Sequence, residues 1–492
     1  MQLATRKIIK YAIHTISIFV LIGCKNSTAQ DASVLEKPNI IVIFTDDHGY
    51  ADLSAQGQVS DIKTPHIDEL ANQGVRMTAG YITAPQCTPS RAGLLTGRYQ
   101  QRFGLDENGT IPLPLDEVLI PTRLKEAGYT TGMTGKWHLE PNHIEHIWIK
   151  ENMPELAKKK PSPKDIPFSK KLPYMPSERG FDDCFQGEMI RYWVNYDLDG
   201  NTIEKQHIVD KRFRLDVQTD AALTFIDRNH EKPFFFYLSY YGPHVPLEAT
   251  DFYLSRFPGD MPERRRYALA MLAAIDDGVG AIRSSLKKHS ILDNTIIFFI
   301  SDNGAPLKIT KEDIPISYKT GAWDGSLNDP FIGEKGMLSE GGIRVPYVVS
   351  WPNKLPKGIT YNRPISSLDV AATSVAVAGL SQPKELDGVN IMPFLSGEKT
   401  GDPHESLYWR FWNQGAVLEG NMKYLQAGNR EFLFDIMSEE HEAKNIIEDH
   451  PEVASKLRSK LENWANELYN PGLSEKNDRP QQAKWFSHYF QE

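Results

Sequence analysis

The stretch Asn39-Ile-Ile-Val-Ile-Phe-Thr-Asp-Asp47 is an apolar run that ends in two carboxylates. A run without polar alternation is typical of a strand that is buried on both faces of a parallel sheet. Segments with helix-like patterns separate it from three similar runs, at residues 233–239, 295–301 and 347–351. The sequence therefore predicts an α/β fold with a large, mostly parallel sheet sandwiched by helices.

Polar residues directly follow three of these runs. Asp46-Asp47 ends the first run, His244 follows the second, and Asp302-Asn303 follows the third. The carboxyl ends of parallel strands meet at one edge of a sheet, which is where the ligand sites of open α/β sheets lie. We therefore expect these side chains to converge, although they are far apart in the sequence.

The pattern changes after residue 400. Short, aromatic-rich runs at 408–412, 422–425 and 432–434 precede a helix-like segment at 451–468. Closely spaced short strands favour antiparallel pairing. The sequence thus predicts a main domain at 38–400 and a small α+β subdomain with an antiparallel sheet at 401–492. Within the main domain, the Lys- and Pro-rich segment 144–176 lacks clear periodicity and is expected to be a surface loop or lid.

The first residues have the character of an export signal. Arg6, Lys7 and Lys10 precede a short apolar run at 16–23 that ends at Cys24. The run is too short to span a bilayer comfortably, which is typical of a signal peptide. Leu21-Ile-Gly-Cys24 also resembles a bacterial lipobox. We expect a lipoprotein signal peptide at 1–24, lipidation of Cys24 and a tether at 25–37, with ordinary secretion and an incidental cysteine as the alternative.

Charge and cysteine content restrict the partners and the stabilising bonds. The 492 residues include 55 basic and 64 acidic residues, for a formal net charge of -9, so no global basic field exists for nucleic acid. The chain has only three cysteines, Cys24, Cys87 and Cys184. If Cys24 carries lipid and Cys87 is chemically converted, Cys184 has no disulfide partner.

The most specific motif is Cys87-Thr-Pro-Ser-Arg-Ala-Gly-Leu-Leu-Thr-Gly97. On physical grounds alone, a cysteine four residues before an arginine could be a thiolate held by that cation, or a buried core residue. The whole stretch, however, resembles the signature of the type I sulfatases, a family of arylsulfatase and N-acetylgalactosamine-6-sulfatase type in the alkaline-phosphatase-like superfamily. In that family a modifying enzyme recognises Cys-x-Pro-x-Arg and oxidises the cysteine to formylglycine (3-oxoalanine).

Other motifs extend the resemblance over residues 38–435. Each one alone could be a cap or a turn, but together they stand in the order that the family uses. They are Asp46-Asp47, Gly135-Lys-Trp-His138, Gly242-Pro-His244, Ser301-Asp-Asn-Gly304, Gly333-Glu-Lys-Gly336 and Glu340-Gly-Gly-Ile-Arg-Val-Pro346. The ending Leu433-Phe-Asp-Ile436 is a looser match.

The resemblance implies a role for each of these positions. Three carboxylates and an amide oxygen form an all-oxygen set that suits calcium or magnesium, and the family favours one Ca²⁺. The metal ligands would be Asp46, Asp47, Asp302, Asn303 and the formylglycine made from Cys87. Lys136 and Lys335 would bind sulfate oxygens, and Arg91 and His138 would orient the geminal diol. His244 would protonate the leaving oxygen, and His138 would take the proton that drives release of sulfate.

The implied activity is hydrolysis of sulfuric esters on a carbohydrate, which is a polysaccharide or its oligosaccharides, with 38–400 as the catalytic domain. The expected partners are the sulfated substrate, a formylglycine-generating or sulfatase-maturating enzyme, and a membrane reached by the N-terminal lipid only. We expect an exported lipoprotein in the envelope of a Gram-negative bacterium, at the outer membrane or in the periplasm, that serves polysaccharide degradation.

Two alternatives remain open at this point. A phosphatase or phosphodiesterase of the same superfamily would usually hold two zinc ions and use Thr or Ser as its nucleophile. An inactive, glycan-binding surface lipoprotein would keep the fold without the chemistry. Four rings, those of His48, Tyr192, Trp193 and Trp323, could shape a sugar subsite or simply pack.

Overall fold

The computed structural model describes residues 37–142, 147–158, 162–317, 321–473 and 477–491. The expected signal peptide, the lipidation at Cys24 and nearly all of the tether lie outside these residues. Residues 37–492 form one compact unit. No helix among the described residues is both long enough and apolar enough to cross a bilayer.

The main sheet has ten strands in the order β11-β2-β10-β9-β1-β8-β4-β5-β6-β7. The opening stretch of the sequence forms β1 (Asn39–Asp46), which lies in the middle and is buried along its whole length. It pairs in parallel with β8 (Phe234–Pro243) and β9 (Thr295–Ser301), so that Ile41 stands between Phe236 and Ile297. β4 (Thr130–Gly135) and β5 (Asp183–Gly187) continue the parallel part.

One strand near each end of the sheet, β10 (Tyr347–Ser350) and β6 (Arg191–Tyr196), runs the other way. β10 is antiparallel to both β9 and β2 (Gly74–Met77), and β11 (Ile359–Tyr361) is parallel to β2. β6 and β7 (Thr202–Val209) form an antiparallel hairpin next to β5. The prediction of a large, mostly parallel sheet is therefore confirmed, with antiparallel strands added on each side.

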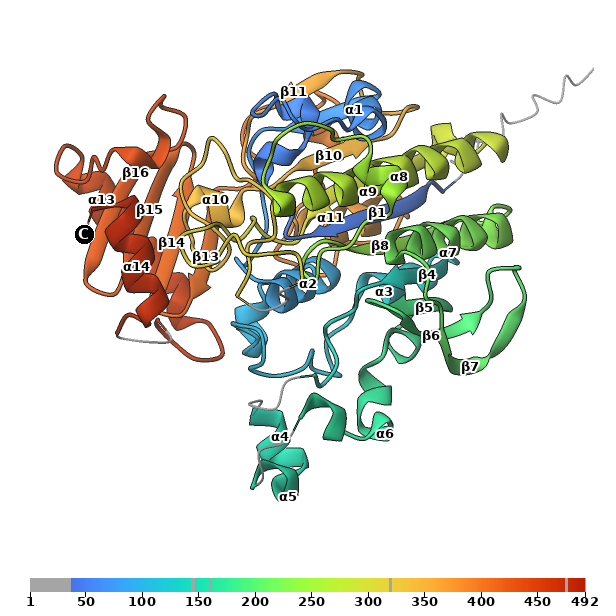
Figure 1. Cartoon of the computed structure of the whole chain (residues 1–492). Coiled ribbons are helices and arrows are strands. Elements are labelled where there is room, and N and C mark those ends of the chain that lie inside the picture. Colours follow the sequence, from blue (N-terminus) through green and yellow to red (C-terminus); the bar gives the residue numbers. More distant parts are fainter. Residues whose placement is uncertain (1–36, 143–146, 159–161, 318–320, 474–476, 492) are drawn as a thin grey trace, which may run out of the picture. The chain divides into compact units, whose positions relative to one another are not determined.

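Helices cover both faces of this sheet (Figure 1). Ile41 and Ile43 of β1 belong to one buried cluster with residues of α1 (Pro65–Asn72), α7 (Arg214–Asn229) and α9 (Glu263–Lys288). The alternate residues Ile40, Val42 and Phe44 belong to the cluster of the opposite face. That cluster includes α2 (Cys87–Thr96), α3 (Ile120–Lys125) and α11 (Asp369–Val377).

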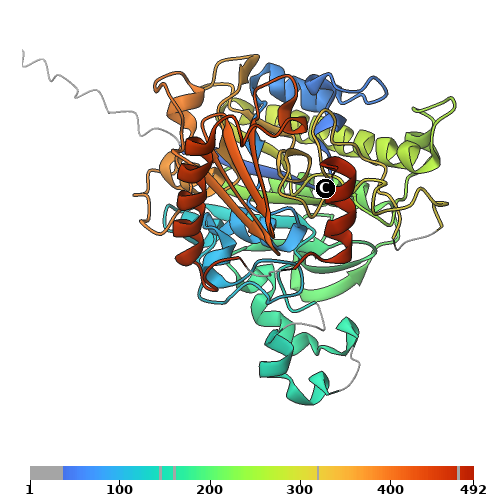
Figure 2. The ribbon, with the colours of Figure 1, turned by 90° about the vertical axis from the view of Figure 1, so that its left-hand side faces the viewer.

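The segment that was expected to be a surface loop or lid contains short helices with a small core of their own. They are α4 (Ile147–Asn152), α5 (Pro154–Ala157) and α6 (Phe168–Lys171). Trp148, Ile149 and Ile166 form that core. Both ribbon views show these helices projecting from the sheet (Figures 1 and 2). The segment is thus an ordered projection in its described part.

A second, separate sheet of four antiparallel strands follows, as predicted. α13 (Pro451–Asn466) and α14 (Pro480–Tyr489) flank this sheet (Figure 2). The strands are β13 (Leu407–Phe411), β14 (Gln414–Glu419), β15 (Met422–Ala427) and β16 (Arg430–Asp435). Phe432 and Phe434 belong to the same cluster as β1 residues, so the second sheet shares the core of the first. The domain boundary at residue 400 stays a prediction.

Candidate active site

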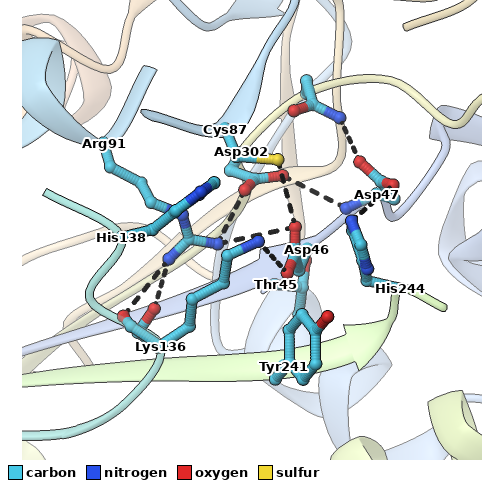
Figure 3. Close-up of polar contacts among 12 residues, drawn as sticks. Thr45, Asp46, Asp47, Cys87, Arg91, Lys136, His138, Tyr241, His244 and Asp302 are labelled. Carbon is cyan, nitrogen blue, oxygen red and sulfur yellow. Dashed lines mark hydrogen bonds and ion pairs between the residues drawn. The ribbon is translucent and has the colours of Figure 1, made fainter. Parts of the chain in front are cut away.

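The side chains that were expected to converge do lie together, beyond the carboxyl ends of the central strands (Figure 3). Asp46 ends β1, and Asp302 and Asn303 follow β9. Lys136 and His138 follow β4, and His244 follows β8. Cys87 is the first residue of α2, which places its side chain beside β1.

The carboxylates are held by backbone contacts between the two loops. Asp47 has a positive φ of 60° and donates its backbone N–H to Asp302 Oδ1 at 3.1 Å. The Asp302 N–H in turn donates to the carbonyl of Thr45 at 3.0 Å. Asp46, Asp47 and Asp302 are all buried. The reciprocal contacts thus fix three acidic groups next to one another away from water.

Three cations balance these three carboxylates. Arg91 lies 2.6 Å from Asp302, Lys136 lies 2.7 Å from Asp46, and Lys335 lies 2.6 Å from Asp47. Burial opposes ionisation of the carboxylates, but Lys136 holds the pKa of Asp46 well below its usual range and Lys335 lowers that of Asp47. The site therefore combines buried negative and positive charge, as a centre that handles an anion and a cation requires.

One buried oxygen in the cluster has no hydrogen-bond donor among the described residues. Asn303 donates through Nδ2 to Asp47 Oδ1 at 2.6 Å and to the carbonyl of Gly304 at 2.9 Å. Its Oδ1 is buried and accepts no hydrogen bond from this part of the chain. Such an orphaned acceptor is costly unless something binds it. An amide oxygen beside three carboxylates fits a hard cation such as Ca²⁺ or Mg²⁺.

His244 also borders this group. Atoms of Asp46, Asp47, Cys87 and His244 that could ligate a metal lie within 4.8 Å of one another. His244 Nδ1 lies 2.5 Å from the carbonyl of Val245, so Nδ1 carries the proton and Nε2 faces Asp47 at 3.6 Å. Burial lowers the pKa of His244 to about 4, against the opposing charges of Asp46 and Asp47.

Cys87 is buried in the centre of the cluster. Its Sγ lies 3.2 Å from Lys335 Nζ and 3.5 Å from Asp46 Oδ1. Burial and then the charge of Asp302 raise the pKa of the thiol. Thiolate is the nucleophilic form of cysteine, so the unmodified side chain is poorly suited to attack here.

Arg91 and His138 also lie in the group around Cys87 (Figure 3). Arg91 donates to Ser239 Oγ, and its guanidinium lies 5.4 Å from the centre of the Phe44 ring. His138 has a positive φ of 60°, and its Nδ1 lies 3.2 Å from Thr88 Oγ1. The cluster thus contains every residue to which the sequence assigned a catalytic or metal-binding role.

Two neighbours of the cluster were not foreseen. The Tyr241 ring lies 5.0 Å from Lys136 Nζ and stacks with the His244 ring at 5.1 Å. Asp324 Oδ2 accepts the backbone N–H of Val245 at 3.3 Å and also acts on Asp47. Tyr241 could have been found from its place at the end of β8. Nothing in the spacing around Asp324 marks it.

The four candidate rings for a sugar subsite are packing residues instead. His48 and Tyr192 are fully buried, and Trp193 and Trp323 are 9% and 3% exposed. His48 Nε2 lies 2.7 Å from the carbonyl of Asp52, and Trp323 Nε1 donates to the carbonyl of Ser326 at 3.1 Å. A ring that is covered on both faces cannot stack on a sugar.

Comparisons with known proteins agree on one family. The sulfatase family model matches residues 38–380, and a model of the C-terminal part of N-sulphoglucosamine sulphohydrolase matches 332–467. Arylsulfatase A of Bos taurus is 31% identical over 466 residues, which cover 85% of each chain. N-acetylgalactosamine-6-sulfatase of Mus musculus is 32% identical over 411 residues, 80% of this chain and 72% of the relative.

Solved structures agree as well. The crystal structure of Ps i-CgsB in complex with k-i-k-neocarrahexaose has a TM-score of 0.73 and 28% identity, and the match covers 92% of this chain and 97% of that one. The phosphonate monoester hydrolase of Agrobacterium radiobacter, at 21% identity and a TM-score of 0.61, shares the fold. The chain therefore belongs to the type I sulfatases of the alkaline-phosphatase-like superfamily and is a sulfuric ester hydrolase.

Proposed function

We propose that the protein removes sulfate from a sulfated carbohydrate with a formylglycine made from Cys87 and a bound calcium ion. The observation that carries the proposal is the place of Cys87 Sγ, 3.2 Å from Lys335 and 3.5 Å from Asp46, beside the orphaned Asn303 oxygen. The carbohydrate substrate is supported by the saccharide named in the complex of the similar structure.

Asp46, Asp47, Asp302 and Asn303 would hold the cation, with the modified Cys87 as a further ligand. This all-oxygen set favours Ca²⁺ and also admits Mg²⁺. When bound, the ion would neutralise negative charge on the sulfate and lower the pKa of the attacking hydroxyl. The two zinc ions that are usual in related phosphatases are held by several His and Asp residues. Here the cationic side chains of Lys136 and Lys335 lie beside the carboxylates, where a second metal ion would be expected.

The chain's own residues supply the remaining steps. Cys87 Sγ marks where the hydroxyl groups of the hydrated formylglycine would stand. Lys136 and Lys335 would bind sulfate oxygens and stabilise the charge that develops on them. His244 would donate from Nε2 to the departing sugar oxygen, because its Nδ1 is engaged by Val245. Arg91 and His138 would orient the diol.

Release of sulfate is the reason for the modification. His138 would take the proton from the second hydroxyl of the modified residue, so that sulfate leaves by elimination and the aldehyde returns. A serine has no second hydroxyl and would stop after the first half of the cycle. His244 needs a proton at its working pH although burial lowers its pKa to about 4. The negative charge of a bound sulfate ester opposes that shift.

The setting of the enzyme is proposed from the sequence. A maturating enzyme would convert Cys87, and a lipid on Cys24 would attach the exported protein to the envelope of a Gram-negative bacterium. Such a place suits polysaccharide degradation. Labelling with radioactive palmitate, compared between the wild type and Cys24→Ala, would test the anchor.

Activity should follow the fraction of chains in which Cys87 is converted. The protein is expressed with and without a formylglycine-generating enzyme, and mass spectrometry of the peptide that contains Cys87 measures that fraction. Turnover of 4-nitrophenyl sulfate should rise in proportion, while 4-nitrophenyl phosphate stays a poor substrate. Cys87→Ala should be inactive, and Cys87→Ser should turn over at most about once unless the host also oxidises serine. Full activity with an unmodified thiol would refute the mechanism.

A further inference from the structure

Two acidic side chains beside the active site have no use in the chemistry proposed above. Glu140 follows His138 by two residues in the segment after β4, and Glu188 follows β5 directly. β4 and β5 are parallel neighbours with Gly135 opposite Gln186, so both segments leave the sheet at the edge where the active site lies. The topology therefore places both carboxylates next to the segment that carries Lys136.

Among the described residues, neither of these partly buried carboxylates pairs with a cation, unlike the buried acids of the active site. Glu140 Oε2 is buried without a hydrogen bond, and no ion pair joins Glu140 to the described residues. Glu188 is half-buried and makes no hydrogen bond or ion pair with any described residue. By contrast, Asp46, Asp47 and Asp302 each contact a cation. A partly buried carboxylate that has no cation partner destabilises the folded protein. Its presence in two places beside the active site indicates a ligand that donates hydrogen bonds to it.

The charges of the two groups act on each other and on the active site. Burial and then Glu188 raise the pKa of Glu140 to about 6, against neighbouring backbone amides and Lys171. The charge of Glu188 also acts on Lys136 and on Tyr241. Lys136 lies over the Tyr241 ring, which stacks with the His244 ring. Gln218 donates to the carbonyl of Gly187 at 3.3 Å and accepts the backbone N–H of Tyr241 at 3.2 Å. Glu188, which follows Gly187, is therefore close to the side of the site that carries Tyr241 and His244.

We propose that Glu140 and Glu188 form a subsite that accepts hydrogen bonds from the sugar ring carrying the scissile sulfate and disfavours a second sulfate on that ring. Carboxylates accept hydrogen bonds from hydroxyl or ammonium groups and repel anions. The preferred substrate is then a ring with one sulfate and free hydrogen-bond donors. This inference rests on the proposed function and specifies its substrate.

The substrate test uses Glu140→Gln, Glu188→Gln and the matched control Glu155→Gln. Glu155 has the same charge and is exposed on α5. The probes are the monosulfated sugar that the wild type hydrolyses best, among galactose, galactosamine and N-acetylgalactosamine sulfates, and the same ring with one more sulfate. The wild type and Glu155→Gln should prefer the monosulfated ring. Each subsite variant should lower that preference by about tenfold, as expected for one charged hydrogen bond. A preference for galactosamine would identify the donor as ammonium.

Stability gives a second measure that needs no substrate. Because neutralising one of two adjacent unpaired carboxylates removes repulsion, each subsite variant should unfold at a temperature at least as high as the wild type. A clear fall in the unfolding temperature, or an unchanged substrate preference, would overturn the subsite. Hydrolysis of aryl sulfates but of no sugar would also overturn it. Failure on every sulfate ester, with Cys87 fully converted, would instead refute the proposed function.

Discussion

At the scale of the residue, the sequence could predict those side chains of the site that follow buried strands. Asp46, Asp302 and His244 stand at strand ends, and parallel pairing brings such ends together. Glu188 also follows a strand, but nothing in the sequence shows that no cation pairs with it. The sequence also cannot show that Asn303 Oδ1 lacks a hydrogen-bond donor among the described residues, because the donors near a buried oxygen come from several loops.

Lys335 offers a test of the assigned chemistry at this scale. Its Nζ contacts both Asp47 and Cys87, so it should bind the sulfate near the nucleophile. Lys335→Ala should lower kcat/KM for 4-nitrophenyl sulfate roughly 150-fold. This corresponds to a loss of about 3 kcal/mol of transition-state stabilisation, as for other preorganised charges. The control is Lys354→Ala, since Lys354 is exposed beyond β10, which runs antiparallel to β9 and ends at the opposite edge. Kinetics of Lys335→Ala within twofold of the control would place this lysine outside the catalytic cluster.

At the scale of the element, hydrophobic runs predicted the central strands but not all of their directions. β10 has the same apolar character as β9 and yet runs antiparallel to it. A continuous apolar run indicates burial on both faces, and burial alone does not specify direction. The hairpin of β6 and β7 was missed because β7 is largely exposed, so its side chains give no core pattern. A hydrophobic pattern in the sequence therefore reveals a strand only where the strand is buried, and it does not give the strand's direction.

One ion pair joins a loop to α11, and it predicts that the stability of the protein depends on pH. His404 Nε2 lies 2.8 Å from Asp369, the first residue of α11, and both side chains are nearly inaccessible. Burial disfavours the imidazolium, but the Asp369 carboxylate outweighs it and raises the pKa of His404. A raised pKa in the folded state stabilises the protein fully below the unfolded value of about 6.5, and the contribution is lost as the pH rises through the folded pKa.

The wild type should therefore exceed His404→Asn in unfolding free energy by more at pH 5.5 than at pH 8.5. Urea unfolding followed by circular dichroism across this range would measure the difference. The comparison cancels groups that titrate alike in both proteins. A difference that is constant with pH would show that the contact does not depend on the charge of His404.

At the scale of the whole molecule, the second sheet is joined to the rest of the chain by polar contacts as well as by the shared core. The change of pattern after residue 400 predicts a subdomain, and this prediction is compatible with the single compact unit formed by residues 37–492. Trp485 of α14 donates to Glu334 at 2.6 Å, next to Lys335 of the candidate active site. Leu338 N–H and Gln414 Oε1 meet at 3.0 Å. Contacts between distant segments of this kind leave no periodic signal in either segment.

Another of these links is buried and ionic. Lys423 of β15 lies 2.7 Å from Glu340, the first residue of α10 (Glu340–Ile343), and 2.9 Å from Glu442, and all three side chains are fully buried. Arg344 and Tyr81 also contact Glu340, at 3.0 and 2.7 Å. Removing one partner of such a buried cluster leaves an uncompensated charge. Lys423→Met should therefore destabilise the protein by about 3–5 kcal/mol in urea unfolding.

Two further variants make this prediction specific. Lys456→Met removes an exposed lysine that pairs with Glu419, and it should cost under about 1 kcal/mol. Lys423→Met/Glu442→Gln removes a lysine together with one of its two carboxylates, so it should recover part of the loss. Because the cluster joins the C-terminal sheet to α10, which leads into β10 of the main sheet, Lys423→Met should also separate the unfolding of the C-terminal sheet from that of the main sheet. A loss below about 1 kcal/mol, with one cooperative transition, would show that this ionic cluster is not needed to hold the C-terminal sheet in place.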